Sequence, residues 1–419
     1  MTGVQTCALP ILTLESGTGC VHTAPGHGVD DFIVCKKYPE IPIVVPVDNK
    51  GVLTEEAGQF AGLTTEEANK PIAEYLDKIG ALFALKKIKH QYPHCWRCHK
   101  PVIFRATSQW FCSVDDFKDA AVKAAEDVKW YPEWGKDRLQ SMVLERADWC
   151  ISRQRKWGVP IPVVYCKDCG KEIIDDGVMQ KVSDIFGKEG SDAWYAHDAE
   201  YFLPEGFKCP HCGKSNGFEK ESDIMDVWFD SGSSHAAVCR KRPYLKWPAD
   251  VYLEGADQYR GWFQSSLLTS VAAGDGAPYK QIITHGWTVD GEGRKMSKSL
   301  GNGIAPQEII SKYGADILRL WVASADYHAD IRISPEILKQ ISDNYRKLRN
   351  TARYCLGNLY DFDPDKDMVS NDELEELDKY ALMKLDEVIA IARKGYDEYE
   401  YHTTAHALHN FCVVDMSNF

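Results

Sequence analysis

The alternation of apolar and polar positions divides the chain into parts with different predicted structure. Residues 12–32 are interrupted by glycines and a proline, which predicts loops that join short strands. The apolar run at 41–48 predicts a strand, and the alternation at 102–114 predicts a strand pair. Residues 64–82 follow a helical period and begin with two threonines, so a helix with a threonine near its N-cap is expected there.

The later part of the chain alternates short apolar strands with helices. Strands are predicted at 226–230, 250–254 and 281–287, and a helix is predicted at 258–273. This strand–helix–strand order indicates an α/β fold with a parallel sheet and crossover helices. From Pro306 to the end, the pattern is helical.

Length and charge narrow the class of protein. A chain of 419 residues corresponds to roughly two to four domains, and 44% hydrophobic residues supply an ordinary buried core. The net charge of −13 argues against indiscriminate nucleic-acid binding but leaves room for a local basic stripe. We find neither an apolar run of about 18 residues nor a signal peptide, so no membrane association is expected. The Cys-x-x-Cys pairs are typical of metal or redox sites, which favours a reducing cytoplasmic compartment.

A basic loop with the sequence VDGEGRKMSKSLGN occupies residues 289–302, after the predicted strand at 281–287. In an open α/β sheet, ligands bind beyond the carboxyl ends of the strands. Lys295 and Lys298 lie between glycines that let such a loop move, and their ammonium groups suit the polyphosphate of a departing pyrophosphate. The alternative is a solvated basic turn without a ligand.

Two cysteine pairs of the form Cys-x-x-Cys-Gly predict a metal site. In each pair the glycine permits a tight turn whose backbone N–H groups face the thiolates. Two such pairs make a closed tetrahedral site, which is structural rather than catalytic, and the expected metal is zinc. The expected ligands are Cys166, Cys169, Cys209 and Cys212. A redox role is the weaker alternative.

A third pair, Cys95 and Cys98, is a weaker metal candidate. His94 and His99 could complete a local site, although ring geometry within six residues is awkward. Metal binding at this pair is therefore left open.

Several segments together resemble one family. Residues 293–302, GRKMSKSLGN, resemble the second signature of class I aminoacyl-tRNA synthetases. Residues 149–162, 226–235 and 252–263 narrow the resemblance to the isoleucine enzymes, because the valine and leucine relatives carry different sequences at 257–263. The resemblance covers nearly the whole chain.

The resemblance implies the second half of a class I Rossmann-type catalytic domain, together with parts of other domains. Residues 12–137 are expected to be part of an inserted β-rich editing domain, and residues 138–325 the catalytic half. A zinc-ribbon insert is expected at about 163–222, and the signature loop at 295–299. Residues 326–419 are expected to hold the stem-contact region and the start of an α-helical anticodon-binding domain.

Both ends of the sequence suggest a piece of something longer. Residues 1–11, MTGVQTCALPI, match the conceptual translation of a sequencing-library adapter, and we interpret them as adapter-derived. A genuine N-terminal tail is the alternative. The sequence also stops within an apolar helical pattern that has no stop signal.

The resemblance also implies roles for single residues in the synthetic site. The residues implied to bind the isoleucyl-adenylate are Glu254, Gly255, Asp257 and Gln258. Lys298 is implied to contact the ATP phosphates with help from Lys295. Trp228 and Trp262 are implied to be walls of the aliphatic side-chain pocket, with ordinary core packing as the alternative.

A second, hydrolytic site is implied as well. An aliphatic pocket separates isoleucine from valine by only about 1–3 kcal/mol, a magnitude for which enzymes of this family are the standard example. By resemblance, Asp31 grips the α-ammonium of the misactivated substrate and His22 helps to exclude the larger side chain. Loop histidines with satisfied hydrogen bonds are the alternative. The threonine-rich stretch that the family carries upstream of this motif does not occur in the chain.

The implied activity is ATP-dependent formation of isoleucyl-adenylate and transfer to tRNA(Ile), with hydrolysis of misactivated valine. The implied partners are L-isoleucine, ATP with Mg²⁺ and tRNA(Ile), and the complete protein is expected to be a monomer. One rival is a valine enzyme of the same class, and another is a non-catalytic zinc-ribbon tRNA-binding or scaffold protein. A basic helix face at 346–353 could contact phosphates or only water.

A missing motif leads to a prediction about activity. Class I enzymes need a His-x-Gly-His element in the first half of the nucleotide fold, and residues 1–419 contain none. The purified 419-residue chain should therefore not catalyse isoleucine-dependent exchange of pyrophosphate into ATP. Measurable exchange above a no-enzyme control refutes this expectation.

Overall fold

The computed structural model describes residues 21–96, 98–297 and 300–417. The chain divides into two compact units, Met1–Gln109 and Trp110–Phe419, and each is described by itself. The interpretation of residues 1–11 as adapter-derived lies outside the described residues.

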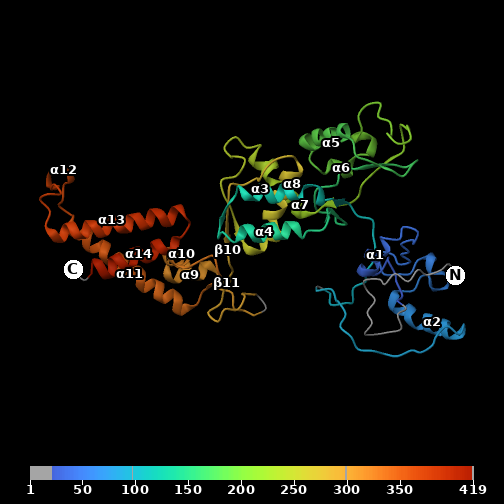
Figure 1. Ribbon diagram of the computed structural model, residues 1–419, viewed down its shortest axis with the longest axis horizontal. Helices are drawn as coiled ribbons and strands as arrows, with labels where there is room; N and C mark the ends of the chain where they lie inside the picture. Colours follow the sequence, from blue (N-terminus) through green and yellow to red (C-terminus); the bar gives the residue numbers. More distant parts are fainter. Residues whose placement is uncertain (1–20, 97, 298–299, 418–419) are drawn as a thin grey trace. The chain divides into compact units, whose positions relative to one another are not determined.

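The first unit is built from helices and loops as far as it is described. Its elements are α1 (Val29–Cys35), the 3₁₀ turn η1 (Glu55–Phe60) and α2 (Thr65–Lys78) (Figure 1). The predicted threonine cap of α2 is confirmed. The Thr64 hydroxyl accepts from the Glu67 N–H at 3.2 Å, and the Glu67 carboxylate accepts from the Thr64 N–H at 2.9 Å.

The strand predicted at 41–48 is wrong. Only an isolated bridge between Val47 and Leu53 forms there. A strand persists only where its backbone groups find partners, and the apolar side chains of Ile43 and Val44 are 51% and 52% exposed. The described residues of this unit therefore lack the β-rich character that the resemblance implied.

A parallel three-stranded sheet forms the centre of the second unit. Its strands are β2 (Lys129–Tyr131), β10 (Gln281–His285) and β9 (Tyr252–Gly255), in the order β2-β10-β9. Ile282 lies opposite both Trp130 and Tyr252. The strands predicted at 250–254 and 281–287 are thus confirmed as parallel neighbours.

Helices cover this sheet. They are α3 (Lys118–Glu126), α4 (Gly135–Leu144), α7 (Val227–Gly232), the 3₁₀ turn η5 (Ala256–Arg260) and α8 (Trp262–Ala272). Helix α3 packs on α4 and α8, and α7 packs on α8 (Figure 1). The shared core is fully buried at Leu139, Phe263 and Leu267. Residues 118–137, which the resemblance places with the editing part, therefore pack within this second unit.

Two other expectations for this unit need correction. The strand predicted at 226–230 is wrong, because this segment forms helix α7. A run of three apolar residues is too short to separate strand from helix, and close packing on α8 decides. Of the strand pair predicted at 102–114, only β1 (Phe111–Cys112) forms, paired with β3 (Trp149–Cys150).

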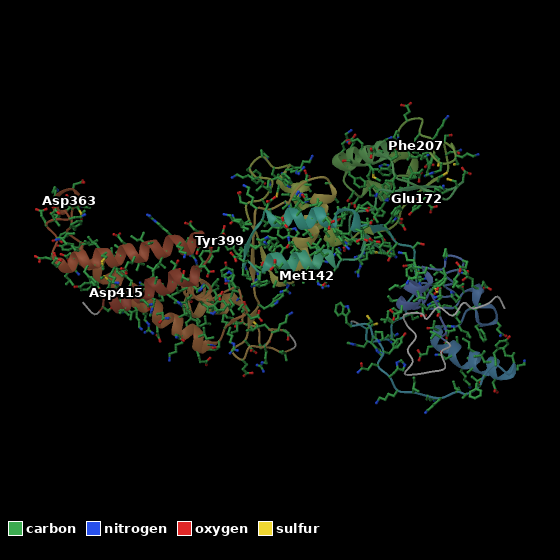
Figure 2. The ribbon with its side chains drawn as sticks, viewed as in Figure 1. Met142, Glu172, Phe207, Asp363, Tyr399 and Asp415 are labelled. Carbon is green, nitrogen blue, oxygen red and sulfur yellow. The ribbon has the colours of Figure 1, made fainter. Side chains whose placement is uncertain are left out.

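A separate insert leaves and re-enters this core through a short antiparallel pair, β4 (Ser152–Arg153) and β8 (Ile224–Met225). The insert contains β5 (Val164–Cys166), β6 (Glu172–Ile173), β7 (Phe218–Lys220), α5 (Asp176–Glu189), α6 (Ala193–Ala196) and the 3₁₀ turn η3 (Ala199–Phe202). Its own hydrophobic cluster, centred on Trp194 and Phe202, lies within residues 164–218. Glu172 and Phe207 mark this insert in Figure 2.

The end of the chain is helical, as predicted. Its elements are α9 (Pro306–Tyr313), α10 (Ala315–Ser324), α11 (Pro335–Asn358), α12 (Pro364–Asp367), α13 (Glu376–Asp397), α14 (Tyr401–Asn410) and η6 (Phe411–Asp415). One short strand, β12 (Ile331–Arg332), pairs in parallel with β11 (Thr288–Val289). Within the described residues, every helix is either too short or too polar to serve as a membrane span.

Candidate functional site

The carboxyl ends of β9 and β10 meet at one edge of the sheet. Glu254 pairs in register with Thr284, and Gly255 pairs with His285. A side chain at Gly255 would lie 2.9 Å from the Asp257 carboxylate and 3.4 Å from the His285 ring. Glycine at this position therefore lets Asp257 and His285 approach the strand end.

Gln258 connects this strand end to helix α8. Its amide N–H donates to the Asp257 carboxylate at 3.0 Å, and its amide oxygen accepts from the Trp262 N–H at 2.8 Å. The structure thus brings together Gly255, Asp257 and Gln258, which were predicted as a group. The carboxylates of Glu254 and Asp257 belong to exposed residues that a ligand can reach.

Of the two tryptophans predicted as pocket walls, Trp262 begins α8, and Trp228 lies on α7 with its ring near Gly261. Trp262 stacks on Tyr252, with ring centroids 3.9 Å apart and planes 9° apart, and its indole N–H donates to the Ser231 carbonyl at 3.0 Å. A side chain at Gly261 would lie 3.0 Å from the Trp228 ring. Trp228 is 42% exposed, so its ring has free surface, whereas Trp262 is held on one face by Tyr252.

Two residues beside this group were not anticipated. His285 ends β10 next to Gly255, and its ring Nδ1 lies 2.8 Å from the Gly286 carbonyl. Asp230 lies on α7, where burial and the nearby Asp226 carboxylate raise its pKa to about 6. A histidine at the end of an apolar strand is a signal that sequence reasoning could have used, whereas the environment of Asp230 depends on packing.

The signature loop is held at its base by one carboxylate. Asp290 is 8% exposed, and its oxygens accept from the backbone N–H groups of Glu292 and Arg294 at 3.0 and 2.8 Å. They also accept from the Arg294 side chain at 2.8 Å and from the Asn302 amide at 2.9 Å. The Asn302 oxygen in turn accepts from the Ser297 N–H at 2.9 Å. Asp290 and Asn302 thereby join the two ends of the loop.

These bonds favour the ionised form of Asp290. The Asn302 amide and the Arg294 backbone N–H are the main causes that hold the pKa of Asp290 well below its ordinary value, together with the Arg294 guanidinium. A lowered acid pKa stabilises the folded state at pH values above the ordinary aspartate pKa. The contribution of Asp290 to the stability of the folded state is lost only as the pH falls through the lowered pKa of this residue.

Lys295 extends from this loop over an aromatic ring. Its ammonium nitrogen lies 4.8 Å from the centroid of Trp287, which is a cation–π contact. In the described part of the chain, no hydrogen bond or ion pair joins Lys295 to Glu254 or Asp257. The predicted ATP contact of Lys298 lies outside the described residues.

The predicted editing residues lie in the first unit. The Asp31 carboxylate, near the start of α1, accepts from the Ala24 N–H at 2.9 Å, which closes the loop before the helix. His22 is exposed. The ring of the neighbouring His27 lies 2.9 Å from the Phe104 carbonyl, as expected for a loop histidine with a satisfied partner. The roles of His22 and Asp31 stay predictions.

The four cysteines of the insert converge on one point. All four sulfur atoms lie within 4.8 Å of one another, with 3.6 Å between Cys166 and Cys212 and 3.8 Å between Cys169 and Cys209. The two Cys-x-x-Cys-Gly turns are alike. Gly170 and Gly213 have φ values of 69° and 75°, and their N–H groups donate to the carbonyls of Cys166 and Cys209.

This arrangement fits a metal ion. Sulfur separations of 3.6 Å and more exclude disulfides, whose bonds are near 2.05 Å. Although burial opposes ionisation, the N–H groups of His211 and Cys212 lower the pKa of Cys209 to about 7. The Lys214 N–H favours the Cys212 thiolate, but burial and the neighbouring sulfur atoms raise the pKa of Cys212 to about 12. Thiolates this close repel one another unless a cation lies between them. Four sulfur donors with N–H support suit zinc in a closed, structural site.

The pair Cys95 and Cys98 forms a similar turn without a complete site. The Cys95 N–H donates to the Lys100 carbonyl, and His99 takes the left-handed conformation, with φ of 58°. Within residues 21–96, 98–297 and 300–417, no cluster of three or more potential ligands includes this pair. Metal binding at Cys95 and Cys98 therefore stays a prediction.

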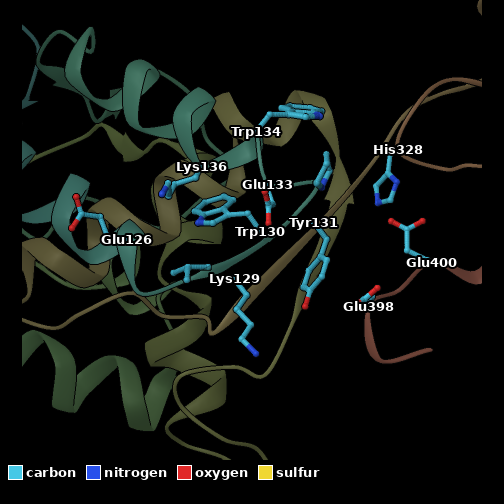
Figure 3. A pocket seen from close by; sticks show the side chains of 12 residues that line it. Glu126, Lys129, Trp130, Tyr131, Glu133, Trp134, Lys136, His328, Glu398 and Glu400 are labelled. Carbon is cyan, nitrogen blue, oxygen red and sulfur yellow. The ribbon is translucent and has the colours of Figure 1, made fainter. Parts of the chain in front are cut away.

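A large cavity lies elsewhere. It has a volume of about 1120 Å³ and is lined by β2 and by the segment between α13 and α14 (Figure 3). Figure 3 shows His328 and Glu400 on one side and Tyr131 and Trp134 on the other. None of the predicted adenylate-binding residues lines this cavity, so its size does not indicate the synthetic site.

The chain is similar to a known family of enzymes and to individual members of it. The sequence model of class I tRNA synthetases (I, L, M and V) matches residues 31–334. The isoleucine–tRNA ligase of Caldicellulosiruptor bescii is 62% identical over 407 residues, and that of Moorella thermoacetica is 57% identical over 406. The matches cover 97% of this chain but only 44% and 43% of those relatives, so the chain spans less than half of their length.

A solved structure supports the fold. Methionyl-tRNA synthetase of Mycobacterium tuberculosis, bound by methionyl-adenylate, aligns with a TM-score of 0.52 at 20% identity. The alignment covers 76% of this chain and 54% of that chain. At this identity the likeness establishes the α/β architecture alone.

The cysteine cluster leads to a prediction about metal content. The purified chain should contain about one zinc ion, measured by elemental analysis, and Cys209→Ser should lose it because one of four ligands is removed. Cys239→Ser changes a cysteine outside the cluster and should keep the zinc. Equal zinc content in both variants contradicts the proposed ligand set.

The loop geometry leads to a second prediction. Asp290→Ala removes the carboxylate that holds the ends of the loop, so trypsin should cut after Arg294 and Lys295 about tenfold faster, as expected for the loss of several charge-assisted hydrogen bonds. Mass spectrometry of timed digests at neutral pH identifies the cut sites. Glu308→Ala changes an exposed carboxylate on α9, outside the loop, and is the control that should leave the rate unchanged.

Proposed function

The chain belongs to the class I tRNA synthetases of the isoleucine, leucine, methionine and valine group, and we propose that the whole protein attaches isoleucine to its tRNA. The observation that best supports this proposal is the 57–62% identity with isoleucine–tRNA ligases over 97% of the chain. A valine enzyme is the less supported alternative. Because the chain spans less than half of those relatives, activity, substrates and partners are part of the proposal.

Adenylate formation needs groups that hold the amino acid and stabilise charge. We assign Glu254 and Asp257 to the α-ammonium and the ribose hydroxyls, because exposed carboxylates at a strand end accept charge-assisted hydrogen bonds. Gly255 lets the backbone come close to the ligand, and Gln258 orients Asp257 through the 3.0 Å hydrogen bond. In the proposed reaction, the isoleucine carboxylate attacks the ATP α-phosphorus on the side opposite to the pyrophosphate, which leaves.

The side-chain pocket is proposed to lie between the two tryptophans. The stacking of Trp262 on Tyr252 fixes one wall, and the exposed face of Trp228 offers the other. Two aromatic walls select for an apolar side chain by excluding water. They reject a side chain one methylene shorter only weakly, which is the physical reason for a separate hydrolytic site with His22 and Asp31.

The signature loop is proposed to stabilise the departing pyrophosphate. Lys295 and Lys298 supply positive charge that matters most as negative charge develops on the leaving group. Asp290 keeps the base of the loop closed through its hydrogen bonds to Arg294 and Asn302. Magnesium enters with ATP as part of the substrate, and among the described residues we assign no protein ligand to it.

The insert is proposed to bind structural zinc through Cys166, Cys169, Cys209 and Cys212. Zinc there supplies folding stability and no open coordination position for a reaction. tRNA(Ile) is the proposed RNA partner. A cytoplasmic location and a monomeric state complete the proposal.

The experiment uses a polypeptide that joins residues 12–419 to a first half carrying the His-x-Gly-His element. It should catalyse pyrophosphate exchange with isoleucine in preference to valine. Lys295→Ala and Lys298→Ala should each lower the exchange rate about 10²–10³-fold, the usual effect of removing one stabilising donor, at unchanged folding.

Lys241→Ala changes an exposed lysine outside the loop and is the matched control. Exchange that depends on valine more than on isoleucine favours the valine alternative. If neither amino acid supports exchange in the joined polypeptide, the ligase proposal fails.

A further inference from the structure

A second cavity lies between the end of helix α4 and the start of helix α8. It has a volume of about 500 Å³ and is lined by Met142, Glu145, Arg146, Ala147, Arg260 and Gln264. The first four residues come from the end of α4 and the segment after it, and the others from η5 and α8. Figure 2 labels Met142 on α4. None of the residues assigned above to the adenylate, the tryptophan pocket or the loop lines this cavity.

Arg146 forms no ion pair with a carboxylate in the described part of the chain, although the nearby Asp226 carboxylate favours its charged form. It lies over the Trp149 ring, 4.9 Å from the centroid, and donates through Nη1 to the Gln264 oxygen at 2.5 Å. Its Nε is buried without a hydrogen-bond partner among the described residues. Burial lowers the pKa of Arg146, but an arginine remains charged in a protein. Because Asp226 also accepts from Trp149 and pairs with Arg153, it compensates the charge of Arg146 only in part.

Arg260 and Gln264 add further donors to the same wall. Arg260 is exposed and makes no hydrogen bond, ion pair or ring contact with the described residues. Gln264 is 2% exposed, and because its oxygen accepts from Arg146, its amide N–H₂ is the group left to donate. Among the residues that line the cavity, the acidic one is Glu145, which is exposed.

The balance of charge and donors decides the chemistry of the ligand. Two guanidinium groups and a buried amide offer many N–H donors and few acceptors, which suits an oxyanion. Guanidinium groups bind phosphates by paired, charge-assisted hydrogen bonds and are less strongly hydrated than lysine ammonium groups. A phosphate matches this cavity better than a cationic or an apolar ligand does.

We propose that the cavity lined by Arg146, Arg260 and Gln264 binds the phosphate of a nucleotide or of an RNA backbone. The site is distinct from the lysine loop. It does not rest on the proposed ligase function, because phosphate binding is measured without any turnover. Arg260, which lines the cavity, follows Gln258 by two residues in the sequence.

The test is titration calorimetry on the 419-residue chain with three probes: inorganic phosphate, ATP and a tRNA transcript. Arg260→Gln removes one exposed cation and should weaken binding of the preferred probe about tenfold, the usual effect of one guanidinium–phosphate pair. Arg242→Gln, at an exposed arginine that does not line the cavity, is the matched control and should bind as the unchanged chain does.

Arg146→Met tests the buried donor while keeping side-chain volume. Circular dichroism checks that this variant folds, and Arg260→Gln alone decides the outcome if it does not. Loss of ATP affinity identifies a nucleotide phosphate, and loss of tRNA affinity identifies an RNA phosphate. Equal affinities of the unchanged chain, Arg260→Gln and Arg242→Gln, or binding of inorganic phosphate only, overturn the proposal.

Discussion

Parallel pairing of β9 with β10 is the constraint on which the candidate synthetic site depends. Because parallel strands end at the same edge of a sheet, the register Glu254–Thr284 and Gly255–His285 places two strand ends side by side, although they lie about thirty residues apart in sequence. The segments after the two strands therefore share one neighbourhood. The acidic and amide groups lie at the end of β9 and just after it, and the segment that leads to the basic loop comes after β10.

The strands β9 and β10 and the loops after them could be predicted from the sequence, because a short apolar run followed by turn residues is a clear pattern for a buried strand. The cysteine cluster was equally predictable, since both turns repeat one spacing and one glycine. Helix α7 was not, because three apolar residues at 227–229 fit either structure and the choice came from packing. Gly232 settles it, as a side chain there would lie 2.8 Å from the Ser265 carbonyl of α8.

The signature loop shows a different limit of sequence reasoning. Its glycines suggested free movement, and Gly293, with φ of 83°, does take a conformation that favours glycine. Yet the base of the loop is tied by the pairing of Asp290 with Asn302, twelve residues apart. No sequence pattern predicts that Asp290 and Asn302 pair, because both residue types are common in loops. The positive charge of the lysines is thus carried on a loop whose ends are fixed, within a chain that is acidic overall.

Asp226 joins the insert to the candidate pocket. It is 4% exposed, and its carboxylate accepts from the Trp149 indole N–H at 3.0 Å and pairs with Arg153 at 3.3 Å. Trp149 and Arg153 precede the insert, whereas Asp226 comes after it and begins α7, the helix that carries Trp228. A buried carboxylate with two donors is costly to separate from them. The root of the insert and one pocket wall therefore share a single anchor, while the cysteine cluster and the Trp194 core hold the rest of the insert independently of that anchor.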